Sequence, residues 1–421
     1  MKLNVMNIGS NFISCVSADI QPDERGEPSS IRITSYGISN SEGVTEGYMT
    51  AREKFKHSVL EALKKLAGDQ SESVNDFYIS ITGTHIKGKE QAVQRAWSSE
   101  MHVISPEDIE KVMESSRSIS ISPDYIIISI HPNEFQIDDH TEAYNPLGMK
   151  ARKLEMKSYV MYSESSRLEN LRSALVELGI TPRGFFYQPV AAGYAVMSPS
   201  DLNFGISVLI DVGHSTTDFA IWKSGSLVRA GSIPIAGMHI TKDIMVGLNI
   251  KNFRAAERLK LTHGIAHEDL VEENDLIKIS ELKSGKTAEI PRKVLARIIY
   301  ARLYEIFYHV KNEINGYRDK ESTPMNVVLV GGSANIEGIE KVAHEVLNSP
   351  VSIGEVTGFA NLPQELKWTS FASTLGTVKL VIRNRMLFGG ISVEKKEEKT
   401  NKVKSFFSKV KDSVKQFLDE V

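Results

Sequence analysis

The chain is poor in cysteine, with Cys15 as its single thiol in 421 residues. One cysteine cannot form a disulfide within the chain, so a disulfide-rich framework is excluded and a reducing compartment is expected. Cys15 itself is predicted to be a small buried apolar residue, because free cysteines are more often packed than reactive.

Long apolar runs and an excess of one charge are also missing. No run of roughly 18 apolar residues, the length that crosses a bilayer, occurs, and the first residues lack a signal-peptide pattern. The formal net charge of −3 gives no general attraction to nucleic acid. We therefore expect a cytoplasmic protein that spans no bilayer and has no nucleic-acid partner. With 41% apolar residues, the chain is long enough for two or more lobes.

The stretch VLIDVGHSTTDFAIW, residues 208–222, predicts a strand, a tight polar turn and a second strand. Small residues in the turn would let backbone N–H groups approach phosphate oxygens, and Asp211 or Asp218 could hold a hydrated magnesium ion. An ordinary hairpin is the alternative. The turn residues in question are Gly213, His214, Ser215, Thr216 and Thr217.

Three other segments carry related signals: a second hairpin, a helix of small residues, and a strand followed by a glycine-rich turn and a helix. VMNIGSNFI, residues 5–13, predicts another hairpin with a Gly-Ser turn, and two such hairpins suggest two lobes with a cleft between them. YQPVAAGYAV, residues 187–196, predicts a helix of small residues with Pro189 in its first turn. NVVLVGGSANIEGIEKVAHEVL, residues 326–347, predicts a strand, a Gly-Gly-Ser turn and a helix from about Ile336.

In this order the four motifs resemble the phosphate-1, connect-1, phosphate-2 and adenosine motifs of the actin-like ATPase superfamily. Further segments are similar to the bacterial cell-division protein family FtsA, and the resemblance runs from about residue 3 to residue 388. These segments are YISITGTHIKG (78–88), YNPLGMKARKLEMKSYVM (144–161), AGMHITKDIMVGL (236–248), AAERLKLTHGIA (255–266) and LARIIYARLYEIF (295–307).

The resemblance implies an α/β, actin-like, two-lobed (ribonuclease H-like) fold with subdomains 1A, 1C, 2A and 2B and a C-terminal amphipathic helix. Strand-like runs at 77–82 and 125–130 and a Ser105–Asp108 capping box fit subdomain 1C. The expected bounds are 1–77 and 164–195 for 1A, 78–163 for 1C, 196–244 and 321–390 for 2A with a return to 1A, 245–320 for 2B, 391–402 for a linker and 403–421 for the helix.

The resemblance also implies a site for ATP and Mg²⁺ in the cleft. Gln188 and Asp211 would be the catalytic residues, and Asp211 and Asp218 the metal ligands. Glu257 and Lys260 match the family's pair beside the ribose and base, although an ordinary solvated helix pair is the alternative. The expected nucleotide-binding residues are Gly9, Ser10, Asn11, Gly213, His214, Ser215, Thr216, Thr217, Gly237, Glu257, Lys260, Gly331, Gly332 and Ser333.

Several positions depart from the family pattern. Asn7 replaces the usual aspartate of the phosphate-1 hairpin, and an amide cannot neutralise magnesium as a carboxylate can. Phe12 stands where a lysine is frequent, and His214 narrows a turn that is usually richer in glycine. We therefore expect a site that binds ATP and hydrolyses it slowly or not at all.

The last segment, KVKSFFSKVKDSVKQFLDEV, predicts an amphipathic helix that lies in the surface of an anionic membrane. A helix docked on the protein's own body or on a partner is the alternative. Its modest positive charge predicts weak binding by one copy and avidity from polymerisation. At 100° per residue, one arc of about 120° holds Val403, Phe406, Phe407, Val410, Val414, Phe417, Leu418 and Val421, and the flanking lysines include Lys404, Lys409, Lys411 and Lys415.

The family resemblance implies a membrane-tethered adaptor that polymerises with bound ATP and anchors the FtsZ ring at the division site. Arg292, Arg297 and Arg302 in the 2B region would suit the acidic, apolar C-terminal peptide of FtsZ, unless they are ordinary solvated arginines. The other expected partners are copies of itself, anionic lipids and later division proteins through 1C. A PilM-like platform protein and an actin-fold ATPase or kinase with real turnover are the alternatives.

Overall fold

The computed structural model describes residues 1–22, 28–68, 75–97, 100–138, 141–143, 145–279, 282–285, 287–318 and 323–388. The predicted linker at 391–402 and amphipathic helix at 403–421 lie outside the described residues. None of the helices within the described part is both long and apolar enough to cross a membrane.

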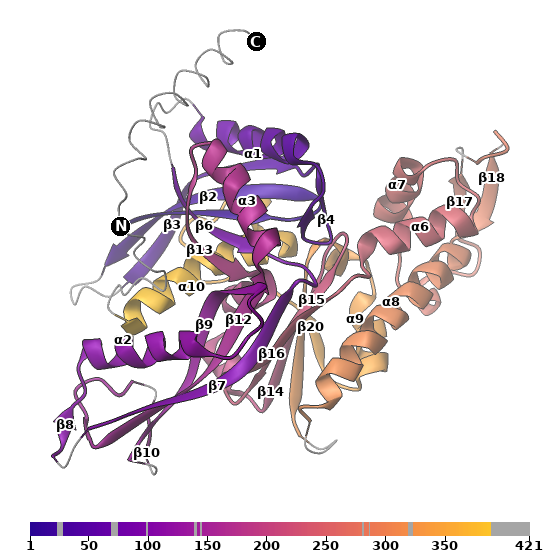
Figure 1. Ribbon diagram of the computed structural model, residues 1–421. Helices are drawn as coiled ribbons and strands as arrows, with labels where there is room; N and C mark the ends of the chain where they lie inside the picture. Colours follow the sequence, from indigo (N-terminus) through magenta and orange to yellow (C-terminus); the bar gives the residue numbers. More distant parts are fainter. Residues whose placement is uncertain are drawn as a thin grey trace, which may run out of the picture.

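Two five-stranded sheets form the two lobes of the molecule (Figure 1). The first has the order β13-β6-β1-β2-β3 and the second the order β16-β15-β14-β19-β20. The first sheet consists of β1 (Lys2–Ile8), β2 (Phe12–Pro22), β3 (Pro28–Asn40), β6 (Asp76–Ile81) and β13 (Thr181–Tyr187). The second consists of β14 (Ile206–Val212), β15 (Thr217–Lys223), β16 (Ser226–Ile233), β19 (Met325–Val330) and β20 (Val351–Ile353).

The two sheets have the same connectivity. In each, a central strand pairs antiparallel with the next strand of the chain, which pairs antiparallel with a third. On its other side the central strand pairs in parallel with a strand that comes later in the chain. The central strands β1 and β14 are buried along most of their length, which explains their continuous apolar runs. The hairpins expected at 5–13 and 208–222 are confirmed.

Two helices lie between the lobes and pack against each other: α4 (Gln188–Val196) and α10 (Ala372–Phe388). α4 contacts β14 and β15 of the second sheet and β6 and β13 of the first, while α10 contacts β1, β2 and β6. The helix predicted from Gln188 is therefore confirmed, with Pro189 in its first turn, where a missing N–H costs no helical hydrogen bond. α1 (Arg52–Ala67) covers β2 and β3, and α3 (Ser165–Glu177) packs on β13.

A second, smaller unit is inserted in the first lobe between β6 and α3. Its four-stranded sheet has the order β10-β9-β12-β7, and a short pair β8-β11 lies at its tip. The run at 77–82, which we placed in this unit, is β6 and pairs in parallel with β1 and β13, so it belongs to the first sheet. The subdomain bounds stay a prediction. The strands of the insert are β7 (Ile86–Ala96), β8 (His102–Val103), β9 (Tyr125–Ile137), β10 (Thr141–Ala143), β11 (Lys150–Ala151) and β12 (Lys153–Glu164).

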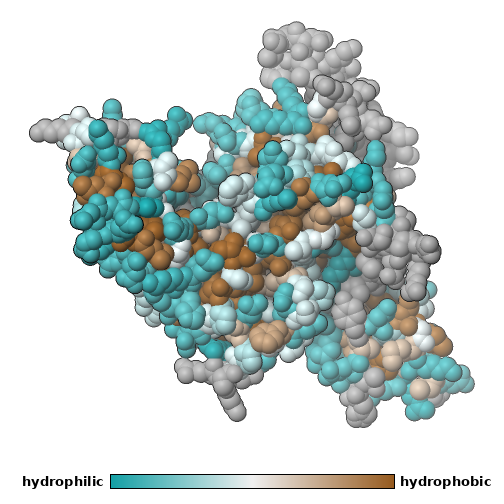
Figure 2. All heavy atoms as spheres, turned by 180° about the vertical axis from the view of Figure 1, so that it is seen from behind, coloured by the Kyte–Doolittle hydropathy of each residue, from teal (hydrophilic) through white to brown (hydrophobic). Residues whose placement is uncertain are grey.

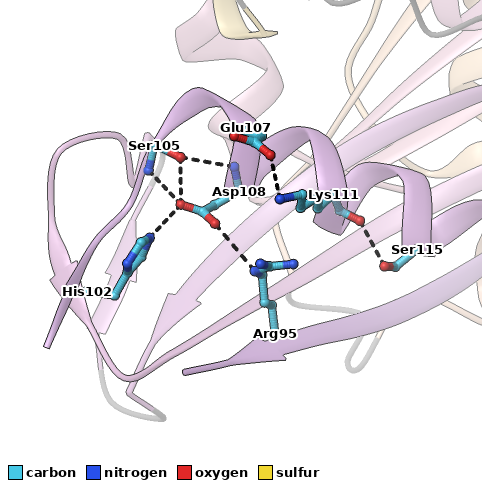
Figure 3. A network of polar contacts seen from close by, with 7 residues as sticks. All are labelled: Arg95, His102, Ser105, Glu107, Asp108, Lys111 and Ser115. Carbon is cyan, nitrogen blue, oxygen red and sulfur yellow. Dashed lines mark hydrogen bonds and ion pairs between the residues drawn. The ribbon is translucent and has the colours of Figure 1, made fainter. Parts of the chain in front are cut away.

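The helix of the insert, α2 (Pro106–Ser115), begins at the expected capping box (Figure 3). Ser105 Oγ accepts a hydrogen bond from the backbone N–H of Asp108, and the Asp108 carboxylate accepts from the N–H and the hydroxyl of Ser105. His102 Nε2 lies 2.7 Å from the same carboxylate, and Arg95 lies 3.4 Å away. Burial opposes ionisation of Asp108, but the bonds from Ser105 and His102 outweigh it and lower its pKa to about 2.

The second lobe carries an arm that extends away from its sheet (Figure 1). The helix expected from about Ile336 begins three residues later, because Gly338 has a left-handed backbone that no helix interior tolerates. The arm contains α6 (Gly237–Gly247), α7 (Phe253–His263), α8 (Arg292–Asn315) and the pair β17 (Leu276–Ile279) and β18 (Ala288–Pro291), and α9 (Ile339–Leu347) packs on α8. The remaining elements are α5 (Pro199–Asn203), β4 (Val44–Thr45), β5 (Tyr48–Met49) and short 3₁₀ turns at 116–118, 268–270, 332–335, 364–367 and 369–371.

Replacing Asp108 with alanine is expected to destabilise the start of α2 by about 1–3 kcal/mol, since it removes the cap and leaves Ser105 and His102 without their acceptor. The contribution of Asp108 should be present above pH of about 4 and be lost as the pH falls toward 2, since its folded pKa is lowered. Hydrogen exchange of the α2 amides at pH 7 measures the destabilisation by Asp108→Ala, and the difference between variant and wild type should shrink when the exchange is repeated at pH of about 2 to 3. Glu107→Ala, which removes an exposed carboxylate paired with Lys111, is the control and should leave exchange unchanged.

Candidate functional site

The turns of the two central hairpins have the same geometry. The N–H of Gly9 bonds to the carbonyl oxygen of Phe12 at 3.2 Å, and the N–H of Gly213 bonds to that of Thr216 at 3.1 Å. In both turns a side-chain carbon on the glycine would lie 2.9 Å from the accepting oxygen, which is too close. Glycine is therefore required at both positions for the turn to close.

The two turns meet across the gap between the lobes. Ser10 Oγ lies 2.5 Å from Ser215 Oγ, and the same Ser215 oxygen accepts a bond from the N–H of Glu46 at 2.9 Å. Thr217 donates its hydroxyl to the carbonyl oxygen of Ile235. Both Ser215 and Thr217 are buried, and neither lines the cavity described below. Their hydroxyls therefore hold the lobes and the turn in place, and their assignment as nucleotide-binding residues stays a prediction.

A cavity of about 560 Å³ lies between the two turns. Most of the residues expected to bind nucleotide line it, although they come from segments more than 300 residues apart in the chain. The predicted residues that line the cavity are Gly9, Ser10, Asn11, Gln188, Asp211, Gly213, His214, Thr216, Asp218, Gly237, Glu257, Lys260, Gly331, Gly332 and Ser333.

Other lining residues were not found from the sequence: Thr82, Leu261, Gly264, Asn335, Ile336, Trp368, Ser370 and Ser373. Thr82 directly follows β6, and Ser373 lies in the first turn of α10 between Ala372 and Thr374, without a recognisable motif. Their positions follow from strand pairing and helix packing, which a local pattern does not encode. Asn335 and Ile336 belong to the quoted Gly-Gly-Ser segment and could have been included.

Two carboxylates lie side by side at the wall of the cavity, with Asp218 buried and Asp211 half-buried. Asp211 and Asp218 are directly opposite each other on β14 and β15. Burial, followed by the charge of Asp218, raises the pKa of Asp211 to about 7, although Ser373 donates a hydrogen bond to it at 3.1 Å. Burial also raises the pKa of Asp218, against hydrogen bonds from Thr216 and Tyr187. The pair therefore lacks a compensating positive charge.

The Gly-Gly-Ser turn lies directly beside this pair. Gly331 has a φ of 94°, and a side-chain carbon there would lie 2.4 Å from the carboxylate oxygen of Asp211. Thr369 holds the turn from the other side, because its hydroxyl donates to the carbonyl oxygen of Gly331 at 2.8 Å. Ser333 donates its hydroxyl to the carbonyl oxygen of Gly213 at 3.3 Å, which joins the turn to the second hairpin.

Glu257 and Lys260 form a buried network rather than a solvated helix pair. Lys260 Nζ lies 2.9 Å from Glu257 and donates to the carbonyl oxygen of Gly237 at 3.1 Å and to the hydroxyl of Thr241 at 2.9 Å. Thr241 in turn donates to Glu257. Burial lowers the pKa of Lys260, while Glu257 opposes that shift. The network fixes the start of α6 against α7 at the wall of the cavity.

Three residues that depart from the family pattern, Asn7, Phe12 and His214, and the family-matching Gln188 make contacts within the protein. Asn7 is buried and accepts a hydrogen bond from Ser80 at 2.8 Å. Gln188 donates its side-chain amide to the carbonyl oxygen of Ile8 at 2.9 Å. Phe12 packs on Phe371, with ring centroids 5.1 Å apart. Burial lowers the pKa of His214, so this side chain is neutral at pH 7 and adds no positive charge to the cavity.

The electrostatics of the cavity favour a cation together with an anion. Asp211 and Asp218 supply uncompensated negative charge, while the charge of Lys260 is offset by Glu257. Carboxylate oxygens are the ligands that Mg²⁺ prefers, and it usually keeps several waters and binds substrate phosphates besides one or two protein carboxylates. The two aspartates therefore fit a hydrated Mg²⁺. Among the described residues no group of three or more histidine, cysteine or acidic side chains could hold a metal without such further ligands.

The three arginines predicted to receive a partner are already paired within the chain. Arg292 lies 3.2 Å from Asp275, Arg297 lies 2.6 Å from Glu268, and Arg302 lies 2.6 Å from Asp243. Arg292 and Arg302 are largely covered, whereas the side chain of Arg297 is 67% exposed. The charges of these arginines are therefore offset by nearby carboxylates, and the three residues do not form a basic patch.

Two lobes with the same sheet connectivity, two facing hairpin turns and one cavity between them define an actin-like protein, and the fold class predicted from the sequence is confirmed. The solved "PilM-PilN type IV pilus biogenesis complex" contains a similar chain (TM-score 0.60, 14% identity, covering 91% of this chain and 99% of that one). MreB 5 of Spiroplasma citri bound to AMPPNP is also similar (TM-score 0.51, 14% identity, covering 92% and 98%). At such identities the likeness shows the fold alone.

Sequence comparison gives the family. The model of "Cell division protein FtsA" matches residues 208–376, and that of the "SHS2 domain inserted in FTSA" matches residues 83–162. The cell division protein FtsA of Borreliella burgdorferi is 29% identical over 96% of this chain and 94% of its own length. That of Neisseria meningitidis is 26% identical over 89% and 88%. The chain belongs to the FtsA family, and its role lies in bacterial cell division.

Replacing Asp211 with asparagine is expected to stabilise the ligand-free protein at pH 8 by about 1–3 kcal/mol, because it removes one of two buried like charges. Since the folded pKa of Asp211 is raised, the wild type should lose stability as the pH rises from about 4 to about 7. Denaturant unfolding of the wild type and the variant from about pH 4 to pH 8 tests both statements. Asp124→Asn, an exposed carboxylate in the turn before β9, is the control, and a wild-type stability independent of pH in this window would contradict the assignment.

Proposed function

We propose that this protein is a membrane-tethered actin-like adaptor that polymerises with bound ATP and anchors the FtsZ ring to the cytoplasmic membrane at the division site. The observation that carries the proposal is the cavity between two equivalent hairpin turns, lined by the adjacent carboxylates of Asp211 and Asp218. Membership of the FtsA family supplies the setting, which is bacterial cell division.

The ligand proposed for the cavity is ATP with Mg²⁺. The turns at Gly9–Asn11 and at Gly213, His214 and Thr216 line the cavity, and their backbone N–H groups are proposed to bind the phosphate oxygens. Asp211 and Asp218 would hold hydrated Mg²⁺, which supplies the positive charge that the acid pair lacks. The solved relative with the same fold, MreB 5 of Spiroplasma citri, is bound to AMPPNP, a nucleotide.

Turnover of this nucleotide is expected to be slow. An amide stands at Asn7, and its oxygen accepts a hydrogen bond from Ser80. Gln188 is proposed to orient the attacking water, but its amide nitrogen donates to the carbonyl oxygens of Ile8 and Ser80, which leaves only its own carbonyl oxygen for that task. An actin-fold ATPase or kinase with real turnover would need a carboxylate where Asn7 stands. The likeness to PilM concerns the fold, and no feature of the cavity favours a pilus platform.

Attachment to the membrane is proposed to occur through the C-terminal segment 403–421, which lies outside the described residues. The support is its sequence alone, with an apolar face that includes Phe406, Phe407 and Phe417 and lysines on both sides. One copy carries little net positive charge, so polymerisation is proposed to supply the avidity that holds filaments on the membrane.

The proposal is tested by electron microscopy of the full chain on a monolayer of anionic lipid, with and without Mg-ATP. Filaments are expected with Mg-ATP and not without it, and a chain ending at Thr400 should form none on lipid. Phe406→Asp combined with Phe417→Asp should reproduce the truncation, because it places charge on the apolar face. Filaments that need neither nucleotide nor the tail would contradict the adaptor mechanism.

The surface proposed for the FtsZ peptide is the exposed face of α8. Tyr304 and Tyr308 are about half exposed and lie one helical turn apart, with Arg297 on the same helix. Figure 2, which views the molecule from behind, shows that apolar surface is divided into separate areas by hydrophilic residues. Exposed tyrosines and an arginine suit a partner that is both apolar and acidic. Later division proteins are proposed to bind the inserted unit, and this proposal is supported by family membership alone.

Arg297→Glu combined with Tyr304→Ala is expected to weaken binding of an FtsZ C-terminal peptide about tenfold or more, because aromatic and arginine side chains contribute most to such interfaces. Fluorescence anisotropy of the labelled peptide with the full chain measures the Kd. Lys64→Glu, an equal reversal of charge on α1 of the first lobe, should leave the Kd unchanged. Equal affinity of the double variant and the wild type would place the peptide elsewhere.

A further inference from the structure

One of the three tryptophans lies at the cavity without an aromatic partner. Trp97 stacks on His102, and the buried Trp222 packs edge-on against Tyr194. Trp368 lines the cavity, is 59% exposed, and has no ring contact with any part of the chain that the structure describes. Exposed large aromatic side chains at a cavity wall are typical of binding sites, because they present a flat apolar face to a ligand.

The backbone on both sides of Trp368 is fixed. Leu366 and Phe371 are buried in the core between the lobes. The N–H of Phe371 donates to the carbonyl oxygen of Trp368 at 3.0 Å. Thr369 donates to the carbonyl oxygen of Gly331 and accepts a bond from Asn335 at 3.2 Å. The exposed indole is therefore attached to a rigid segment that is bonded to the Gly-Gly-Ser turn.

A second apolar wall approaches the same turn from α7. Leu261 is 74% exposed and lines the cavity, as does Ile336. The N–H of Ala266 donates to the carbonyl oxygen of Glu337 at 2.8 Å, which holds the end of α7 against the segment that contains Ile336. Apolar side chains from three segments thus bracket the turn at 331–335. Phosphate groups gain nothing from such side chains, whereas a planar base does.

We propose that Trp368 stacks on the base of the bound nucleotide and so contributes affinity for the nucleoside rather than for the phosphates. This inference depends on the proposed nucleotide-binding function and adds to it the group that recognises the base. Stacking of a base on an aromatic ring is tolerant of sequence, because every base has a π-face, and alanine substitution of such a ring costs binding free energy. Leu261 and Ile336 cover the remaining apolar surface of the nucleoside.

The test compares two ligands, Mg-ATP and Mg-tripolyphosphate, which share phosphates but differ in the base. Isothermal titration of the full chain gives the Kd of each for the wild type, Trp368→Ala and Trp368→Phe. Trp368→Ala should bind Mg-ATP roughly tenfold more weakly and Mg-tripolyphosphate unchanged. Trp368→Phe should keep most of the affinity, because it retains a ring. Trp97→Phe, a replacement in the inserted unit, is the matched control and should change neither Kd.

The possible results distinguish a failure of the stacking proposal from a failure of the proposed nucleotide-binding function. Wild-type affinity for Mg-ATP in Trp368→Ala overturns the stacking role while leaving nucleotide binding intact. Equal weakening of both ligands in that variant also overturns it, since the side chain would then only shape the cavity. A wild type that binds neither ligand overturns the proposed function itself. In the Trp97→Phe chain, quenching of fluorescence by Mg-ATP that disappears with Trp368→Phe supports direct contact, because Trp222 is buried.

Discussion

The pair formed by the half-buried Asp211 and the buried Asp218 is the constraint on which the rest of the site depends. The two carboxylates are placed opposite each other by the register of one hairpin, and burial raises the pKa of both. Like charges in a dry environment are unfavourable unless a proton or a cation joins them. A cavity built around such a pair favours a ligand that brings its own cation, and Mg-ATP is such a ligand.

Segments from both lobes lie close to the Asp211–Asp218 pair. Gly331 approaches Asp211 closely because it lacks a side chain, and Ser373 reaches the same carboxylate from α10. Ser10 and Ser215 join the two hairpin turns. The amides of Asn7 and Gln188 are committed to hydrogen bonds within the first lobe. Of these contacts, those of Ser10 and Ser373 join the two lobes around the cavity.

Most of the fold, but only part of the site, could be predicted from the sequence. Hairpins at 5–13 and 208–222 were predictable because their turn chemistry and apolar runs are local. The assignment of 77–82 to the inserted unit was wrong, because a short apolar strand does not carry the identity of its partner strands. The buried state of Lys260 was left open, since a Glu-Lys pair three residues apart looks the same on an exposed helix.

The sequence by itself determined the two hairpins, the Gly-Gly-Ser turn, the capping box of α2 and the family, because each depends on residues close together in the chain. Only the tertiary structure decided that Ser215 faces the other lobe, that Arg292 and Arg302 are paired, and that Thr82, Trp368 and Ser373 reach the cavity. These outcomes depend on strand pairing and helix packing between distant segments. Such contacts are selected by the burial of whole surfaces, and no local spacing records them.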